Sequence, residues 1–252
     1  MDRKDAIVKY ALQMGDHALV TGQRLSEWCG HGPVLEQDIA ITNIALDHVG
    51  QTRSWYQFAA ELEGKGRTED DLAYMRTEPE YRNVLLLEQP NTDWAHTIVR
   101  QFLYDVFNYY LHENLAHSPE EGIAAIARKS LKEITYHLRY SSEWMIRLGD
   151  GTELSRQKMQ TALDNLWMFS GELTQMTPLE EFLATLGIAP DLAAIKPLYD
   201  EKVDEIIGEA TLKKPGTTFM QSGGKLGRHT EYMGFILAEM QSLQRQLPGL
   251  KW

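Results

Sequence analysis

The sequence predicts an all-α fold, and two observations support this prediction. Apolar residues recur at helical spacing along nearly the whole chain, and Trp94 opens a row that continues with Ile98, Phe102, Val106 and Tyr110. The nine prolines tend to fall between periodic segments, as expected when proline separates helices. We find no pattern typical of a strand, a repeat or a low-complexity tract. The chain is therefore expected to be helical throughout.

The order of the helices predicts a ferritin-like four-helix bundle with additional C-terminal helices. Two long helices, about 5–29 and from the 30–33 turn to 63, form one hairpin, and a shorter helical pair over 70–87 leads to a second hairpin. The second hairpin joins a helix from Trp94 to one of about 30 residues that ends before 149–151. Further helices are predicted near 152–171, 177–186, 189–210 and 228–246. We expect one domain over 1–252, with a core bundle at about 5–149 and an extension at about 152–252.

Both ends of the last bundle helix carry local signals. Ser118 is the predicted N-cap, with Pro119 at the first helical position and Glu121 completing a capping box. At the other end, Gly149-Asp150-Gly151 predicts a left-handed stop.

Composition excludes several classes of function. A formal net charge of −11 argues against a large nucleic-acid interface, which needs clustered Lys and Arg. The single cysteine, Cys29, excludes a disulfide framework and multi-cysteine zinc sites. The N-terminus lacks the pattern of a secretory signal, and no run of about 18 apolar residues suits a membrane span. A cytoplasmic protein is the expectation.

The longest predicted loop, 211–228, is glycine-rich and locally basic, so we expect it to be flexible and to contact a partner or ligand. A phosphate-binding loop is disfavoured, because Leu226 follows Gly224-Lys225 where Ser or Thr is needed, and no strand precedes the loop.

The bundle pattern allows a direct test for a di-iron site, which takes one Glu from each of two helices and a Glu-x-x-His pair from each of the others. In the first hairpin the candidate pair is Asp47-x-x-Gly50, opposite Asp16 or His17, so glycine replaces the histidine. In the second hairpin Asp105 faces the core, and Glu133 is followed by Tyr136 at the histidine position and by His137 one residue later.

A metal site built from Asp47, Asp105, Glu133 and His137 remains an alternative, because Glu133 and His137 are one helical turn apart. We favour a structural role for these acids, since buried carboxylates are normally paired with local donors.

Other candidate residues give weaker signals. Cys29 beside His31 suggests an activated thiol, but a small buried cysteine is the commoner case. His112 and His117 are expected at the surface or in caps. Aromatic residues at helical spacing are expected in the core: Trp55, Phe58, Tyr104, Trp144 and Trp167.

Several long segments point to one family. They include Asn43–Gln51, Leu86–Asn91, Lys132–Ser141, Gly223–Tyr232 and Leu237–Arg245, and with Leu25–His31 they span nearly the whole chain in order. These segments closely resemble the C subunit family of the bacterial phenylacetyl-CoA ring epoxidase.

The resemblance implies a ferritin-like scaffold subunit without catalytic, cofactor-binding or metal-ligating residues of its own. It also implies a homologous, iron-bearing A subunit as the partner, together with B and D components and a reductase. The implied complex uses oxygen and NADPH to epoxidise the ring of phenylacetyl-CoA in aerobic aromatic catabolism. Gly50 and Tyr136 at the histidine positions agree with this division.

Two rival functions remain at this point: a di-iron oxygenase with its own metal site, and a ferritin-like interaction protein unrelated to phenylacetate. For the partner surface, the first hairpin is the leading prediction, because its aromatic residues suit binding anchors: Trp28, Trp55, Tyr56 and Phe58. The alternative is that these rings pack inside the protein.

Overall fold

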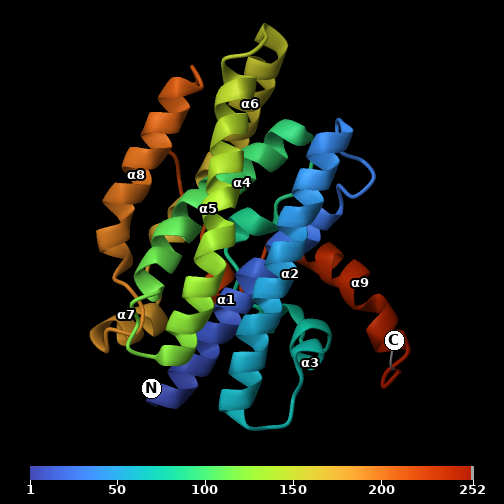
Figure 1. The fold of residues 1–252 in the computed structure, drawn as a ribbon, viewed down its shortest axis with the longest axis vertical. Coiled ribbons are helices and arrows are strands. Elements are labelled where there is room, and N and C mark those ends of the chain that lie inside the picture. The colour runs from blue at the N-terminus through green and yellow to red at the C-terminus, as the bar shows by residue number, and fades with distance from the viewer. Residues whose placement is uncertain (251–252) are drawn as a thin grey trace. The chain divides into compact units, whose positions relative to one another are not determined.

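A computed structural model describes residues 1–250 and confirms the all-α prediction, since these residues form helices and contain no strand (Figure 1). The chain divides into two compact units. The first unit combines residues 1–88 with the segment from Gly223 onward, and the second unit is formed by residues 89–222. Each unit contains one of the two predicted long hairpins.

The first unit is built on the hairpin of α1 (Arg3–Ser26) and α2 (Leu35–Glu63) (Figure 1). Asp2 caps α1 by accepting hydrogen bonds from the backbone N–H groups of Lys4 and Asp5. α2 ends at Gly64, whose φ of 74° gives the left-handed conformation that glycine adopts most easily.

The rest of the first unit is formed by segments that precede and follow the second unit in the sequence. It consists of short helices and one longer C-terminal helix: α3 (Glu69–Tyr74), η1 (Glu78–Glu80), η2 (Leu85–Glu88), η5 (Gly224–Leu226) and α9 (Glu231–Gln246). The predicted helical pair over 70–87 is thus one short α-helix and two 3-10 turns. Gln241 of α9 donates hydrogen bonds to the Ala73 and Arg76 carbonyl oxygens, and this joins α9 to the end of α3.

A buried ion pair fixes the C-terminal segment within the first unit. Glu88 accepts a hydrogen bond from His229 Nδ1 at 2.6 Å, and neither side chain is exposed. The Thr230 backbone N–H and hydroxyl donate to the other Glu88 oxygen, and Asn83 donates to the first. Because His229 Nε2 lies 3.1 Å from the Tyr81 carbonyl oxygen, both ring nitrogens have acceptors, which suits the protonated imidazole.

The second unit contains the other long hairpin, α4 (Trp94–Leu115) and α5 (Glu121–Gly149). The remaining elements follow in order: α6 (Glu153–Leu166), η3 (Trp167–Phe169), η4 (Gly171–Thr174), α7 (Pro178–Thr185) and α8 (Leu192–Glu209). α4 contacts α5, α6 and α8, so it is the central helix of this unit, as its broad apolar row predicts.

Both local predictions for the ends of α5 are wrong. The helix begins at Glu121, so Glu121 is its first residue and not the third, and the Ser118 hydroxyl donates to the Ile188 carbonyl oxygen. At the other end Asp150 has φ −90°, so the stop is not left-handed. Gly149 is needed for space: a Cβ there would overlap the carbonyl oxygen of Ala210.

Within residues 1–250, every helix is too short or too polar to cross a membrane.

Candidate functional site

Asp105 of α4 is the central residue of a buried polar cluster in the second unit. Its side chain is fully buried and accepts hydrogen bonds from Gln101 Nε2 at 2.7 Å and from Ser141 Oγ at 2.8 Å. A ring nitrogen of His137 lies within 4.8 Å of a carboxylate oxygen of Asp105. Gln101 precedes Asp105 by one helical turn, and His137 precedes Ser141 by one turn, so the hairpin brings these four side chains together. The inward orientation predicted for Asp105 is confirmed.

The surroundings of Asp105 change its acidity. Burial raises its pKa, while the nearby His137 and the hydrogen bonds from Ser141 and Gln101 lower it, and the resulting pKa is about 7. The carboxyl group of Asp105 therefore titrates near neutral pH. A carboxylate and an imidazole are also ligand types that bind divalent metals, although both Asp105 oxygens already accept hydrogen bonds.

The other residues of α5 that the motif predicted, Glu133 and Tyr136, do not lie in the buried cluster around Asp105. Glu133 is half-buried and Tyr136 is 41% exposed, whereas His137 is fully buried. The face of α5 that points into the protein therefore runs through Ile134, His137 and Ser141.

On α2 of the first unit, as on α5, the buried residues come one position after the predicted ones. Asp47 is half-buried and Gly50 is exposed, whereas His48 and Gln51 are buried. The predicted pair Asp47-x-x-Gly50 thus lies toward the surface. Sequence reasoning missed His48, although the apolar row through Ile41 and Ile44 continues to it.

Asp16 of α1 lies in a separate buried network of the first unit. The Arg76 guanidinium donates to both carboxylate oxygens, and the Tyr56 hydroxyl donates to Oδ1 at 2.5 Å. The backbone N–H of Arg82 donates to Oδ2 at 2.8 Å. Burial raises the pKa of Tyr56 well above its usual value, so this hydroxyl stays protonated. The negative charge of Asp16 is thus balanced by a cation of the protein.

The donor set does not match a di-iron centre. Such a centre takes a Glu from each of two helices and Glu-x-x-His pairs from the other two. Asp16 is held by Arg76, whose positive charge opposes metal binding, and the residues at the two pair positions, Gly50 and Tyr136, are exposed. Asp105 and His137 remain as one acid and one imidazole from the second unit.

The weaker candidates are also placed by the structure. Cys29 is exposed, contrary to the expected buried thiol. His117 is exposed as predicted, but His112 is buried, and burial lowers its pKa to about 4. Trp55, Tyr104 and Trp167 are core residues as predicted, while Phe58 and Trp144 are half-buried.

The prediction of an aromatic partner surface on the first hairpin is wrong for its two central rings. Trp55 and Tyr56 are 1% and 0% exposed, so both pack inside the protein. The exposed face of α2 instead carries an aliphatic row of Leu35, Ile39, Leu46 and Val49, each about half exposed or more. Spacings of four, seven and three residues place these four side chains on one stripe of the helix.

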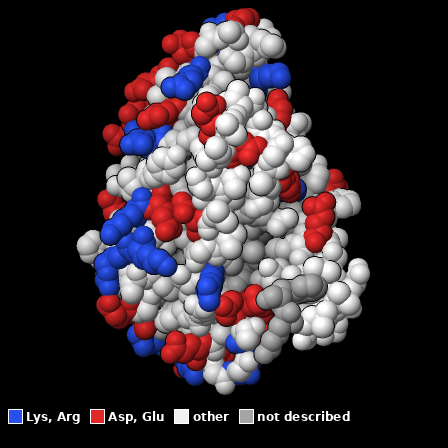
Figure 2. All heavy atoms as spheres, turned by 45° about the vertical axis from the view of Figure 1, so that its right-hand side comes forward, with Lys and Arg blue, Asp and Glu red and all other residues white. Residues whose placement is uncertain are grey.

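Charge on the surface gives a further constraint. On the face drawn in Figure 2, acidic side chains are widely spread, basic side chains lie in several separate places, most of them along the left side, and a broad area is uncharged. That face therefore lacks the continuous basic surface that nucleic-acid binding requires.

Comparison with known proteins places the chain in a family. The family model described as "Phenylacetic acid catabolic protein" matches residues 1–252. The chain is 46% identical over 246 residues to the C subunit of the 1,2-phenylacetyl-CoA epoxidase of Escherichia coli strain K12, covering 98% of this chain and 99% of that protein. An identity of this extent over the full length confirms the resemblance found in the sequence. The chain therefore belongs to the family of phenylacetic acid catabolic proteins.

Proposed function

We propose that this chain is the structural C subunit of a 1,2-phenylacetyl-CoA epoxidase and works in the cytoplasm beside a catalytic partner. The expected partner is the iron-bearing A subunit, with B and D components and a reductase completing the complex. Similarity to an epoxidase C subunit over the full length of both proteins supports this assignment.

The observation that carries the structural role is the buried ion pair of Asp16 with Arg76. A di-iron centre needs several carboxylates whose negative charge offsets the metal charge. In this chain the negative charge of Asp16 is already balanced by the guanidinium ion of Arg76 and not by a metal. The Asp105 oxygens accept hydrogen bonds from Gln101 and Ser141. Oxygen activation is therefore assigned to the partner subunit.

The aliphatic row on α2 is the proposed surface for that partner. Leu35 and Val49 are 14 positions apart, so the row extends about 21 Å along the helix. Leu35 is 72% exposed and Leu46 is 61% exposed, which is unusual for leucines aligned on one face of a long helix. A stable pair of subunits buries on the order of 2,000 Å² or more, with an apolar centre that such a row would supply.

Co-expression with the A subunit of the same complex tests the proposal. We expect the two chains to elute as one species in gel filtration, and the reconstituted epoxidase to turn over only when both are present. Leu46→Lys should weaken the pairing at least 100-fold, because it places a charge in the centre of the apolar interface.

The matched control is Leu154→Lys on α6, where the wild-type leucine is 65% exposed. This variant should pair normally. Separate elution of the wild-type chains at micromolar concentration would overturn the partnership. Equal effects of the two substitutions would remove α2 as the surface.

A further inference from the structure

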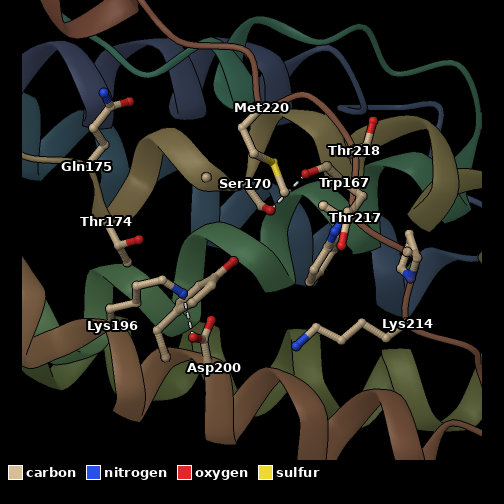
Figure 3. A pocket seen from close by; sticks show the side chains of 14 residues that line it. Trp167, Ser170, Thr174, Gln175, Lys196, Asp200, Lys214, Thr217, Thr218 and Met220 are labelled. Carbon is tan, nitrogen blue, oxygen red and sulfur yellow. Dashed lines mark hydrogen bonds and ion pairs between the residues drawn. The ribbon is translucent and has the colours of Figure 1, made fainter.

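The second unit contains a cavity of about 600 Å³ bounded by α8, the turns η3 and η4, and the loop after α8 (Figure 3). This volume lies within the range of pockets that bind small molecules. The cavity includes the basic part of the long loop, Lys214–Thr218, for which the sequence predicts contact with a partner or ligand.

The loop is attached to the body of the unit on either side of the cavity. Gln160 of α6 bonds to both the N–H and the carbonyl oxygen of Lys213, and the Gln221 N–H donates to the Met168 carbonyl oxygen at 2.7 Å. The backbone of this wall is thus held by hydrogen bonds at both ends, with the Gln160 side chain at one end and with the Met168 carbonyl oxygen at the other.

Two lysines and one aspartate line the cavity, so its lining carries one net positive charge. Lys196 and Lys214 extend into it from opposite sides (Figure 3). Lys196 pairs with Asp200, which also lines the cavity, whereas Lys214 pairs with Asp204, which does not. All these ion pairs are partly exposed, so an incoming anion can compete for the ammonium groups at little cost.

Tyr199 provides an independent sign of a ligand. It lines the cavity and is 4% exposed, yet its hydroxyl finds no hydrogen-bond partner among residues 1–250. Leaving a buried hydroxyl unsatisfied is costly, and such a group calls for an explanation. Because burial raises its pKa, the group stays protonated and can donate a hydrogen bond to an anion.

The remaining wall is suited to an aromatic group. Trp167 and Met220 line the cavity, and Met220 packs against Gly171, where a Cβ would come within 2.7 Å of the Met220 side chain. Indole and thioether side chains make favourable contacts with aromatic rings.

We propose that this cavity binds an organic anion in which an aromatic ring carries a carboxylate or a phosphate. Lys196 and Lys214 would hold the charged group, Tyr199 would donate to it, and Trp167 with Met220 would contact the ring. This inference does not depend on the proposed role as an epoxidase subunit.

Binding can be measured by isothermal titration of the full chain with three probes. Phenylacetate represents an aryl carboxylate, adenosine 5′-monophosphate a ring with a phosphate, and inorganic phosphate an anion without a ring. We expect one of the first two to bind at least tenfold more tightly than inorganic phosphate, and the stronger of them identifies the source of the anion. Binding of neither would overturn the proposal.

Variants then test the assigned residues. Lys214→Ala should weaken binding about tenfold, whereas Lys213→Ala, which removes the same charge from the adjacent position outside the cavity, should leave it unchanged. Tyr199→Phe should weaken binding about fivefold. In the absence of ligand it should keep or raise the melting temperature, because it removes an unsatisfied hydroxyl. Tyr104→Phe, at a buried tyrosine of α4 outside the cavity, is the control for binding. Unchanged affinity in both Lys214→Ala and Tyr199→Phe would contradict the proposal.

Discussion

Arg76 donates hydrogen bonds to both carboxylate oxygens of Asp16, although 60 positions separate the two residues and both are buried. Removing one member of such a pair leaves the other charge buried without compensation, which costs about 3–5 kcal/mol. We therefore expect Arg76→Leu to lower the free energy of unfolding by about that amount in urea denaturation.

The double variant Asp16→Leu with Arg76→Leu should recover part of this loss, since no isolated charge remains. The comparison is Arg156→Ala, which breaks the exposed pair with Glu153 on α6 and should have little effect. If the double variant is less stable than Arg76→Leu, electrostatic compensation is not the main role of this pair.

Asp105→Asn should change how stability depends on pH. In the folded chain the pKa of Asp105 is about 7, above its ordinary value of 3.8, so the folded state binds more protons than the unfolded state between these values. The protonated carboxyl group of Asp105 therefore contributes fully to stability below about pH 4, and this contribution is lost as the pH rises through about 7.

The amide stays neutral at all these pH values and keeps most of the hydrogen bonds. We expect Asp105→Asn to raise the melting temperature at pH 8 and to have less effect at pH 5, as measured by circular dichroism. A lower melting temperature of the variant at pH 8 would argue that the carboxylate is stabilising.

His229→Gln should show a pH effect in a different range. Burial alone would lower the pKa of His229, but the hydrogen bond and charge of Glu88 raise it above 6.5. The ion pair therefore contributes fully below pH 6.5, and its contribution is lost as the pH rises through the folded pKa. The stability difference between the wild-type chain and His229→Gln should be larger at pH 6 than at pH 9.5. A difference that grows with pH would contradict a protonated His229.

The purified chain, expressed in iron-rich medium, should contain no stoichiometric iron in elemental analysis. This follows from the protein partners of Asp16 and from the exposed positions of Gly50 and Tyr136. About two irons per chain, with an oxo-bridged absorption band, would favour the rival function of a di-iron oxygenase. A single divalent metal that is lost in His137→Ala would instead indicate a mononuclear site at His137 and Asp105.

Turnover of the reconstituted complex should be nearly insensitive to the acids first considered as ligands. We expect Asp47→Asn, Asp105→Asn and Glu133→Gln to keep epoxidase activity within about threefold of the wild type. A loss beyond about a hundredfold in a variant that still folds and assembles would mean that this chain stabilises the transition state.

Helical periodicity was enough to predict the two long hairpins, because their apolar rows repeat over many turns. It also predicted the burial of Asp105, which lies on the same row as Ile98 and Phe102. The motif spacing did not identify His48, and it named His137 only as the residue after the expected histidine position, because a search for Glu-x-x-His points to the preceding residue on each helix. Their burial follows from the face of the helix and not from the motif.

Other features depend on contacts between distant parts of the sequence, which no local pattern contains. Arg76 reaches Asp16, and the Ser118 hydroxyl donates to the Ile188 carbonyl oxygen, 70 positions away. The aromatic partner surface failed for the same reason: Tyr56 fills the space over Gly15 and bonds to Asp16, so it cannot contact a partner. The cavity at Tyr199 likewise requires α8, two turns and a loop to converge.

The return of residues 223–230 to Glu88 affects how the protein is made on the ribosome. Residues 89–222 are synthesised before Gly223 emerges, so the second unit can fold first. The first unit must wait, because Glu88 lacks His229 and Thr230 until the last segment has left the exit tunnel. Nascent chains stalled before Gly223 should therefore expose the surface of α3 that α9 later covers.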